Sequence, residues 1–533
     1  MDRPARHLSG QSNSRRHSWG VVVLLGAIVL CYILGTPRNG GPDEPSHMVA
    51  SAGLLRGDRD GQVSADDPLV HNFDLPMMVG RPDPSCWALD PYKPVTCVSS
   101  DPLTTQPAVA RSTSYSYPPW PYLLPGLASF VPWPTTYTYL ARALSAVLAV
   151  LLAAAALNRL RPISPIMTAG ALLSMTPIVW FTLGIVNPSA MAIAGGMALW
   201  TALLTYRDGP RRPNALLALG WAATLLPRRD GPVWLTVIVL VCCVVTNQRP
   251  LQLWQQLPGA IKALMATVTV IPLLNSFIDH DTPFNVLLTL TPLGLIALQL
   301  WMVQWDRWRS SRTRTLAASA TVALIAVVAV ALVRNRPGGF DAEQLRRVVG
   351  QSGEHLRQIV GVLGWLDAAV PWLGVFLFWA ALGGLGLVAM MFAPRVAAIG
   401  LGAIALAVGL AWMMELGQAW SYGNYWQGRY TLPFAIGWGL VFASGWRSRT
   451  DPISERRMAW AIGAMAWAVW NFGFVAAQQR WAVGKDGSYL PWEWNTWGSP
   501  VNPMLLCVIH AVLSAWFVRL AIGASTQPEP ASR

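Results

Sequence analysis

The sequence predicts an all-α, polytopic integral membrane protein. Only 12% of its 533 residues are charged and 53% are hydrophobic, whereas soluble domains have about 25% charged residues. The hydrophobic residues gather in runs about as long as a bilayer is thick, and such runs satisfy their backbone groups as helices. This composition excludes a soluble globular protein, a disordered chain and a disulfide-rich secreted scaffold.

The membrane spans follow from these runs. The first, 19–36, comes after four arginines and has no small-residue cleavage site behind it, so we expect an uncleaved span after a cytoplasmic tail, 1–18. Runs 214–227 and 233–246 are shorter than the roughly 20 residues that cross a bilayer, and they are either tilted spans or a re-entrant pair. We therefore expect about 12–14 spans. The other runs lie at 136–157, 164–185, 189–206, 260–278, 286–303, 315–333, 371–393, 396–416, 431–446, 458–478 and 501–521.

The basic residues indicate which loops face the cytoplasm. Because Lys and Arg hold loops inside, we interpret the net charge of +13 as a topology signal and not as nucleic-acid binding. The long polar segment 37–118 is then an extracytoplasmic loop of a transmembrane domain, 19–521, which a disordered cytoplasmic tail follows at 522–533. Function is expected on the outward loops. Besides 37–118, the outward loops are expected at 334–370, 417–430 and 479–500.

The acidic pair after the first span is the main candidate for chemistry. Pro42-Asp43-Glu44-Pro45 is typical of a helix start, and His47 falls one turn after Asp43. One carboxylate there can take a proton from a hydroxyl, while the second orients it or binds a divalent metal such as Mg, Mn or Ca. The alternative is an N-cap Asp43 beside a solvated Glu44.

Some outward basic residues run against the insertion bias, and binding an anionic ligand is one reason for that. They are Arg228, Arg229, Arg429 and those of the loop from Arg334 to Arg357. Arg429 is predicted to hold a phosphate, with snorkelling to headgroups as the alternative. Arg228 and Arg229 either attract an anionic donor or pair with Asp230. The neighbouring aromatics either stack on a sugar or anchor the interface. These are Tyr425, Trp426 and Tyr430.

Several other residues carry less specific signals of function. His355 and Asp367 lie in a segment that reads as an interfacial helix leading into a span, and Asp367 is favoured as a capping or solvated residue. Arg142 and Glu415 are charges within spans, for which structural roles are favoured. For His280, a polar turn is favoured over a metal site.

The cysteines divide into two groups. Four lie in apolar stretches and are expected to pack there, whereas Cys86 and Cys97 lie eleven positions apart in the polar loop. If that loop faces an oxidising compartment, a Cys86–Cys97 disulfide is expected. The spacings do not match a zinc site.

The motifs, taken together, resemble a known family. PDEPSH at 42–47 resembles the carboxylate motif of GT-C glycosyltransferases. The chain is more closely similar to the bacterial membrane-protein family known as domain of unknown function 2142, although Ser189 stands where that family more often has an acidic residue. The remaining segments that carry the resemblance are YPPWPYLLPG at 117–126 with its neighbours, LARALSA at 140–146, NPSA at 187–190, GVLGWLDAAVP at 361–371 and QGRYTLPF at 427–434.

This resemblance implies an inverting glycosyltransferase in the bacterial plasma membrane, with an extracytoplasmic site. A polyprenyl-phosphate sugar would be the donor, and a cell-envelope glycan, glycolipid or protein the acceptor. Asp43 would act as the base with Glu44 or His47 in support, and Arg429 would neutralise the leaving phosphate with Arg228 or Arg229. The alternatives are a transporter or flippase of lipid-linked sugars and a non-catalytic envelope-assembly subunit.

Overall fold

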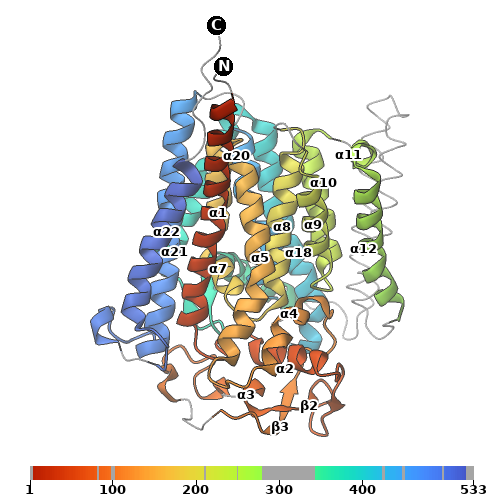
Figure 1. Ribbon diagram of the computed structural model, residues 1–533, viewed down its shortest axis with the longest axis vertical. Coiled ribbons are helices and arrows are strands. Elements are labelled where there is room, and N and C mark those ends of the chain that lie inside the picture. The colour runs from red at the N-terminus through yellow and green to blue at the C-terminus, as the bar shows by residue number, and fades with distance from the viewer. Residues whose placement is uncertain are drawn as a thin grey trace.

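The chain folds into a bundle of helices that stand side by side, with the first loop packed across one end (Figure 1). At the opposite end of the bundle, α1 begins and α22 ends. The computed structural model describes residues 4–80, 83–97, 103–208, 212–248, 250–278, 342–422, 426–446, 451–494 and 497–523.

The described residues contain six helices that are long and apolar enough to cross a membrane, which confirms the all-α polytopic fold. A seventh span is present if the pair α6 (Pro165–Ser174) and α7 (Pro177–Leu183), bent by 73°, counts as one. The expected runs 286–303 and 315–333, and His280, lie outside the described residues. The six are α1 (Pro4–Gly35), α5 (Tyr137–Leu160), α17 (Trp372–Phe392), α18 (Pro394–Tyr422), α21 (Pro452–Val483) and α22 (Pro503–Gly523).

Shorter helices complete the bundle, and α11 and α12 stand at one edge of it (Figure 1). The run at 431–446 is broken into short pieces rather than forming one span, because Pro433 and Gly437 interrupt it. Gly170 of α6 and Gly439 of α20 let these helices touch, since a Cβ on Gly170 would lie 2.4 Å from the Gly439 carbonyl oxygen. The shorter helices are α8 (Pro188–Leu204), α9 (Asn214–Leu225), α10 (Gly231–Thr246), α11 (Pro250–Gln256), α12 (Gly259–Ile278), α15 (Ala342–Gly350), η5 (Gly428–Thr431), α19 (Leu432–Ala435) and α20 (Trp438–Ser444).

The first loop forms a small folded cap. Its helix α2 (Glu44–Leu55) lies where the PDEP motif predicts a helix, and it packs through Met48 and Ala52 against Phe73 of a three-stranded antiparallel sheet. β2 and β3 pair in a register that places His71 opposite Ser112. The other elements of the cap are β1 (Gln62–Val63), β2 (His71–Pro76), α3 (Met77–Gly80), β3 (Pro107–Ser112), η3 (Trp120–Tyr122), α4 (Leu123–Gly126) and η4 (Leu127–Phe130).

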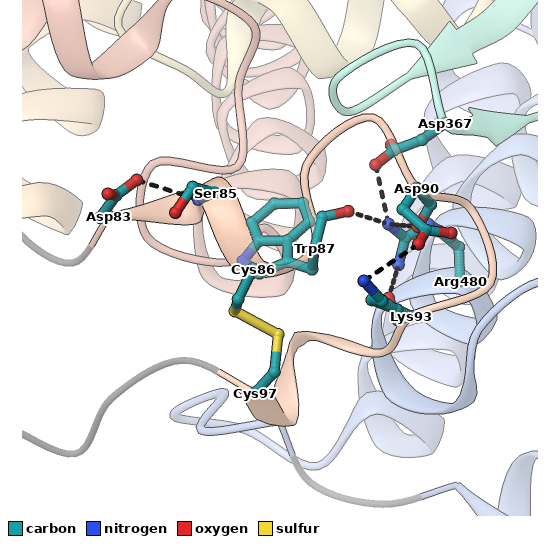
Figure 2. The surroundings of a disulfide bond; sticks show 9 residues. All are labelled: Asp83, Ser85, Cys86, Trp87, Asp90, Lys93, Cys97, Asp367 and Arg480. Carbon is teal, nitrogen blue, oxygen red and sulfur yellow. Dashed lines mark hydrogen bonds and ion pairs between the residues drawn. A yellow bond between two sulfur atoms is a disulfide. The ribbon is translucent and has the colours of Figure 1, made fainter.

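A disulfide loop ties this cap to the end of α21. Cys86, at the end of η1 (Pro84–Cys86), is bonded to Cys97, at the end of η2 (Val95–Cys97), with 6.1 Å between the Cα atoms. Arg480 donates hydrogen bonds to the carbonyl oxygens of Trp87 (2.9 Å), Asp90 (2.8 Å) and Lys93 (2.6 Å), as Figure 2 shows. One arginine therefore holds the turn that the disulfide closes.

The same arginine bonds to a second segment of the chain. Asp367 accepts a hydrogen bond from Arg480 at 2.8 Å, and both side chains are buried. Asp367 lies in a hairpin of β4 (Val362–Leu363) and β5 (Ala368–Ala369), where its carboxylate also accepts the Trp365 backbone N–H. The interfacial helix expected here is thus only partly formed: α16 (Ser352–Gly361) ends at Gly361, and the left-handed Gly364 and Leu366 turn the chain back.

Candidate functional site

Asp43 sits at the junction of α1 and α2 in a left-handed backbone conformation with φ of 62°. Such a φ is uncommon for a residue with a Cβ and is concentrated at functional sites. Although Asp43 occupies the N-cap position, its carboxylate makes no capping bond to the helix. Oδ2 instead accepts a hydrogen bond of 2.6 Å from Arg429, and 47% of the side chain remains accessible. The plain N-cap interpretation is therefore wrong.

Glu44 points the other way and is fully buried. Both of its oxygens accept hydrogen bonds of 2.7 Å from Arg142 of α5. They also accept the backbone N–H groups of Gly41 and Val186, each at 3.1 Å. Arg142 uses its remaining donors on carbonyl oxygens at the end of α1. The prediction of Glu44 as a solvated residue, or as a partner of Asp43 in the site, is therefore wrong: the two carboxylates face different arginines.

His47 lies one turn into α2, on the Asp43 side. Its Nδ1 is 2.8 Å from the hydroxyl of Tyr122, and the ring of Tyr117 packs edge-on against it at 5.3 Å. Burial, with smaller contributions from Arg429 and Arg228, lowers the pKa of His47 to about 3 against the opposing effect of Asp43. His47 is therefore a neutral imidazole at physiological pH.

Arg429 belongs to η5, a segment that lies far from Asp43 in the sequence. It is buried, and its guanidinium lies 5.2 Å from the ring centre of Tyr430. Among the described residues, its Nε has no hydrogen-bond partner. Gly428 allows this approach, because a Cβ there would lie 2.6 Å from the His355 carbonyl oxygen of α16.

Arg228 lies on the other side of the Asp43 neighbourhood, in the turn between α9 and α10. It donates to Asp230 at 2.9 Å and to the Ser189 hydroxyl at 3.0 Å, and its guanidinium lies 4.7 Å from the ring centre of Tyr430. Two guanidinium groups therefore share one tyrosine ring. The predicted ion pair of Arg228 with Asp230 is present, and the attraction of an anionic donor stays a prediction.

Arg229 and the NPSA segment complete the surroundings. Arg229 donates to the backbone oxygen of Ser116 at 3.0 Å. Asn187 caps α8 through the Ser189 N–H at 2.9 Å and donates to the Pro42 oxygen at 3.5 Å. The residue before Asp43 is thus held by a second buried side chain, and Ser189 supplies a hydroxyl, without charge, to Arg228.

The charge state of Asp43 follows from these neighbours. Burial raises the pKa of this carboxyl, but the charges of Arg429 and Arg228 and the hydrogen bond from Arg429 outweigh it, so the pKa is lowered from its ordinary value. Asp43 is therefore ionised at physiological pH. An accessible carboxylate beside two guanidinium groups is an arrangement that can take a proton and hold an anion.

The remaining predicted residues lie behind this site. Trp426 is buried between Trp234 and Tyr430, and its backbone N–H is bound by Glu415. It packs in the wall, where it contacts Trp234 at a tilt and Tyr430 edge-on. His355 is buried on α16 and touches the 426–428 turn through its backbone. Tyr425 lies outside the described residues.

The residues present do not fit a divalent metal held by Asp43 and Glu44. Glu44 already gives both oxygens to Arg142, and Asp43 faces the guanidinium of Arg429. Two guanidinium groups beside Asp43 repel a cation. In the part of the chain that the structure describes, no group of three His, Cys, Asp or Glu side chains could hold a metal ion.

Sequence reasoning missed Tyr117, Tyr122, Asn187 and Ser189 as members of one site. All four lie in segments that were singled out only for their resemblance, and their convergence depends on how the helices pack. The available signal was that short polar motifs recur at the ends of several predicted spans, although these spans lie far apart in the sequence.

The comparisons place the chain in a family. The model of the predicted membrane protein family DUF2142 matches residues 25–438, so the chain belongs to that family. The match contains every residue of the Asp43 site described above. Comparison with curated proteins found no match.

Proposed function

We propose that this DUF2142 member is an inverting GT-C-type glycosyltransferase of the bacterial plasma membrane. It would transfer a sugar from a polyprenyl-phosphate donor to a cell-envelope glycan, glycolipid or protein on the extracytoplasmic side. The observation that carries the proposal is the accessible carboxylate of Asp43 within 2.6 Å of the buried Arg429, beside Arg228.

The two arginines are suited to the donor's phosphate. Guanidinium groups bind phosphate through paired N–H donors, and burial strengthens such bonds. Arg429 and Arg228 lie over the same Tyr430 ring, and the Nε of Arg429 has no partner among the described residues. An anion between these groups would complete the donors that the protein leaves unused.

The lipid tail needs an apolar approach, and the cap offers one. Tyr122, which bonds to His47, belongs to a short helical segment whose outward face is apolar and exposed. In a bilayer this face would lie at the interface, next to the site. The exposed residues are Trp120, Leu123, Leu127, Phe130 and Trp133.

Asp43 is the base in this mechanism. The phosphate binds Arg429 and competes with Asp43 for that guanidinium, so donor binding frees the carboxylate. Asp43 then takes the proton of the acceptor hydroxyl as its oxygen attacks the anomeric carbon. The bond from that carbon to the phosphate oxygen breaks, and polyprenyl phosphate leaves with the electron pair while the arginines stabilise its charge. A single direct displacement inverts the anomeric centre. His47 supports the site as a neutral group, whereas Glu44 acts through Arg142 on the backbone.

The test is Asp43→Asn in the full chain, assayed with radiolabelled polyprenyl-phosphate sugars and delipidated envelope glycans. Transfer is expected to fall by at least about 100-fold, the contribution of a general base. The control is Asp74→Asn, which changes an exposed aspartate of the same cap. Unaltered transfer in Asp43→Asn would contradict the proposal.

A binding measurement on the same variant examines the competition for Arg429. Polyprenyl phosphate without a sugar is the probe, and its affinity is measured by native mass spectrometry. Asp43→Asn is expected to bind it more tightly than the wild type, because the competing carboxylate charge is gone. Weaker binding would mean that Asp43 helps to hold the phosphate and is not displaced by it.

One observation favours a transporter of lipid-linked sugars as the second candidate. The α6–α7 pair is a bent apolar helix pair, and broken helices are typical of transporter binding sites. Thr176 at the break donates to the Ile359 oxygen at 2.8 Å. In a transporter, Asp43→Asn would leave sugar transfer by a partner enzyme intact and change only the side of the membrane on which the lipid-linked sugar appears.

A further inference from the structure

A second cationic recess lies at the opposite end of the bundle from Asp43. It is a cavity of about 510 Å³ between α1, α21 and α22. Arg456 lies near the start of α21, Arg519 near the end of α22, and His17 at the start of the apolar part of α1. The three basic side chains therefore stand near the ends of the apolar parts of their helices.

Among the described residues, the acids nearest to the recess bond to other groups. No carboxylate is among the described residues that line it. Glu455 is turned away and accepts a hydrogen bond of 2.6 Å from the Ser164 hydroxyl. Asp451 accepts the backbone N–H groups of Ile453 and Ser454 at the start of α21. The described acids nearby thus cap helices and do not line the recess beside Arg456 and Arg519.

The walls of the recess are aromatic and apolar. Trp460 and Trp516 line it together with Leu520 and Gly523. Tryptophan is enriched at headgroup depth, where one part of the ring is wet and the other contacts hydrocarbon. Such walls offer apolar contacts, which an amphiphile can make with its hydrocarbon part and a small hydrated anion cannot.

An apolar column on α22 leads to the recess. Val508, Val512 and Trp516 follow one another at four-residue spacing, and more than half of each side chain is exposed. Arg519 comes one turn after Trp516 on the same helix. An acyl chain lying along this column would bring a phosphate to Arg519.

We propose that this recess binds the headgroup of an anionic phospholipid. The phosphate contacts Arg456 and Arg519, and one acyl chain follows the exposed face of α22. Basic pockets between transmembrane helices on the cytoplasmic side bind such headgroups. The site is separate from the Asp43 site, and it does not depend on the proposed sugar transfer.

The test compares lipid binding by the purified full chain and its variants. Phosphatidylglycerol and phosphatidylcholine are the probes, and native mass spectrometry counts the lipids retained. The Arg456→Gln/Arg519→Gln double variant is expected to lose about tenfold in phosphatidylglycerol affinity, and phosphatidylcholine binding is expected to stay unchanged. Arg457→Gln is the matched control, because Arg457 is the next residue along α21 and does not line the recess.

Two further arms make the result decisive. Arg456→Lys/Arg519→Lys keeps the charge and is expected to keep the preference for phosphatidylglycerol, which separates the role of charge from any loss of folding. Inorganic phosphate is added as a competitor. Equal phosphatidylglycerol binding in the Gln double variant and the control would overturn the proposal, and so would full displacement of the lipid by inorganic phosphate, because the recess would then be a site for a free anion.

Discussion

Two neighbouring carboxylates meet two arginines, and the two junctions differ in how many donors are satisfied. At the Glu44–Arg142 junction, all five N–H donors of Arg142 are used: two on Glu44 and three on the carbonyl oxygens of Ile33, Thr36 and Pro37. At the Asp43–Arg429 junction, the described residues leave the Nε of Arg429 without a partner, and nearly half of Asp43 is accessible.

The difference separates a structural ion pair from one that can exchange partners. Arg142 closes the end of α1, where the unpaired carbonyl groups of a helix need donors, and thereby fixes the turn that carries Asp43. Arg429 is equally buried but incompletely satisfied, and a buried donor without a partner is costly unless a ligand fills it. Both arginines are buried, so burial does not distinguish them. They differ in whether all of their N–H donors have hydrogen-bond partners.

The largest effect is expected from Arg142→Met, which leaves Glu44 buried without its partner. Breaking a buried ion pair in this way costs about 3–5 kcal/mol in the free energy of unfolding. Thermal unfolding of the purified protein measures it, with Arg38→Met as the control because Arg38 donates to the Thr135 backbone oxygen and not to a buried carboxylate. A melting temperature equal to that of the control would mean that the Arg142 network does not hold the fold.

Arg429→Gln is expected to weaken the binding of polyprenyl phosphate without unfolding the protein. Hydrogen bonds to charged groups contribute about 1.5–3 kcal/mol, which corresponds to a loss of about 10–100-fold in affinity. Arg357→Gln is the control, since Arg357 pairs with Glu354 on α16. Unchanged affinity in Arg429→Gln would remove the distinction between the two junctions.

The pH dependence of stability reports on His47. Unfolded His47 takes up a proton at its ordinary pKa of 6.5, whereas the folded imidazole stays neutral down to about 3. The unfolded state therefore binds more protons in this window, and the free energy of unfolding falls as the pH decreases from 6.5, by at most about 1.4 kcal/mol per pH unit.

Comparison of the wild type with His47→Gln between pH 7 and pH 5 isolates this effect. Asp43 does not contribute in that range, because its pKa is lowered and its stabilising charge is lost only below its ordinary value of 3.8. Equal pH dependence in the two proteins would show that His47 is not buried as a neutral group.

The smallest effect is expected from Tyr122→Phe, which removes the hydroxyl that bonds to His47 Nδ1. A neutral hydrogen bond contributes about 0.5–1.5 kcal/mol to the free energy of unfolding. Tyr115→Phe is the control, because Tyr115 stacks on His71 through its ring. A loss in Tyr122→Phe no larger than in Tyr115→Phe would mean that His47 is held by packing alone.

Much of the fold was predictable because the membrane restricts it. The predicted helix at the PDEP motif is present as α2, and most predicted spans within the described residues coincide with helices. The run at 431–446 did not become one span, since Pro433 and Gly437 break it while α8 packs against the pieces. A hydropathy profile gives the length of an apolar run, but it does not reveal where the helix breaks within that run.

The site was predictable in part. Asp43, His47, Arg228 and Arg429 were each expected to carry function, and the structure brings all four together. Glu44 was assigned to the wrong neighbour, because adjacent residues at a helix start can point to opposite sides once the backbone at Asp43 turns left-handed. No spacing in the sequence reveals that turn, which depends on Arg142 and Arg429 from distant segments.

The sequence alone determined that the chain crosses a membrane many times, because a bilayer admits few ways of satisfying a backbone in apolar runs. It also determined which residues are chemically able to serve a site. The tertiary structure decided which arginine each carboxylate meets, since that choice depends on helices more than 90 positions apart packing against one turn. Pairing energies between buried charges depend on geometry at the scale of a hydrogen bond, and the order of residues does not encode that geometry locally.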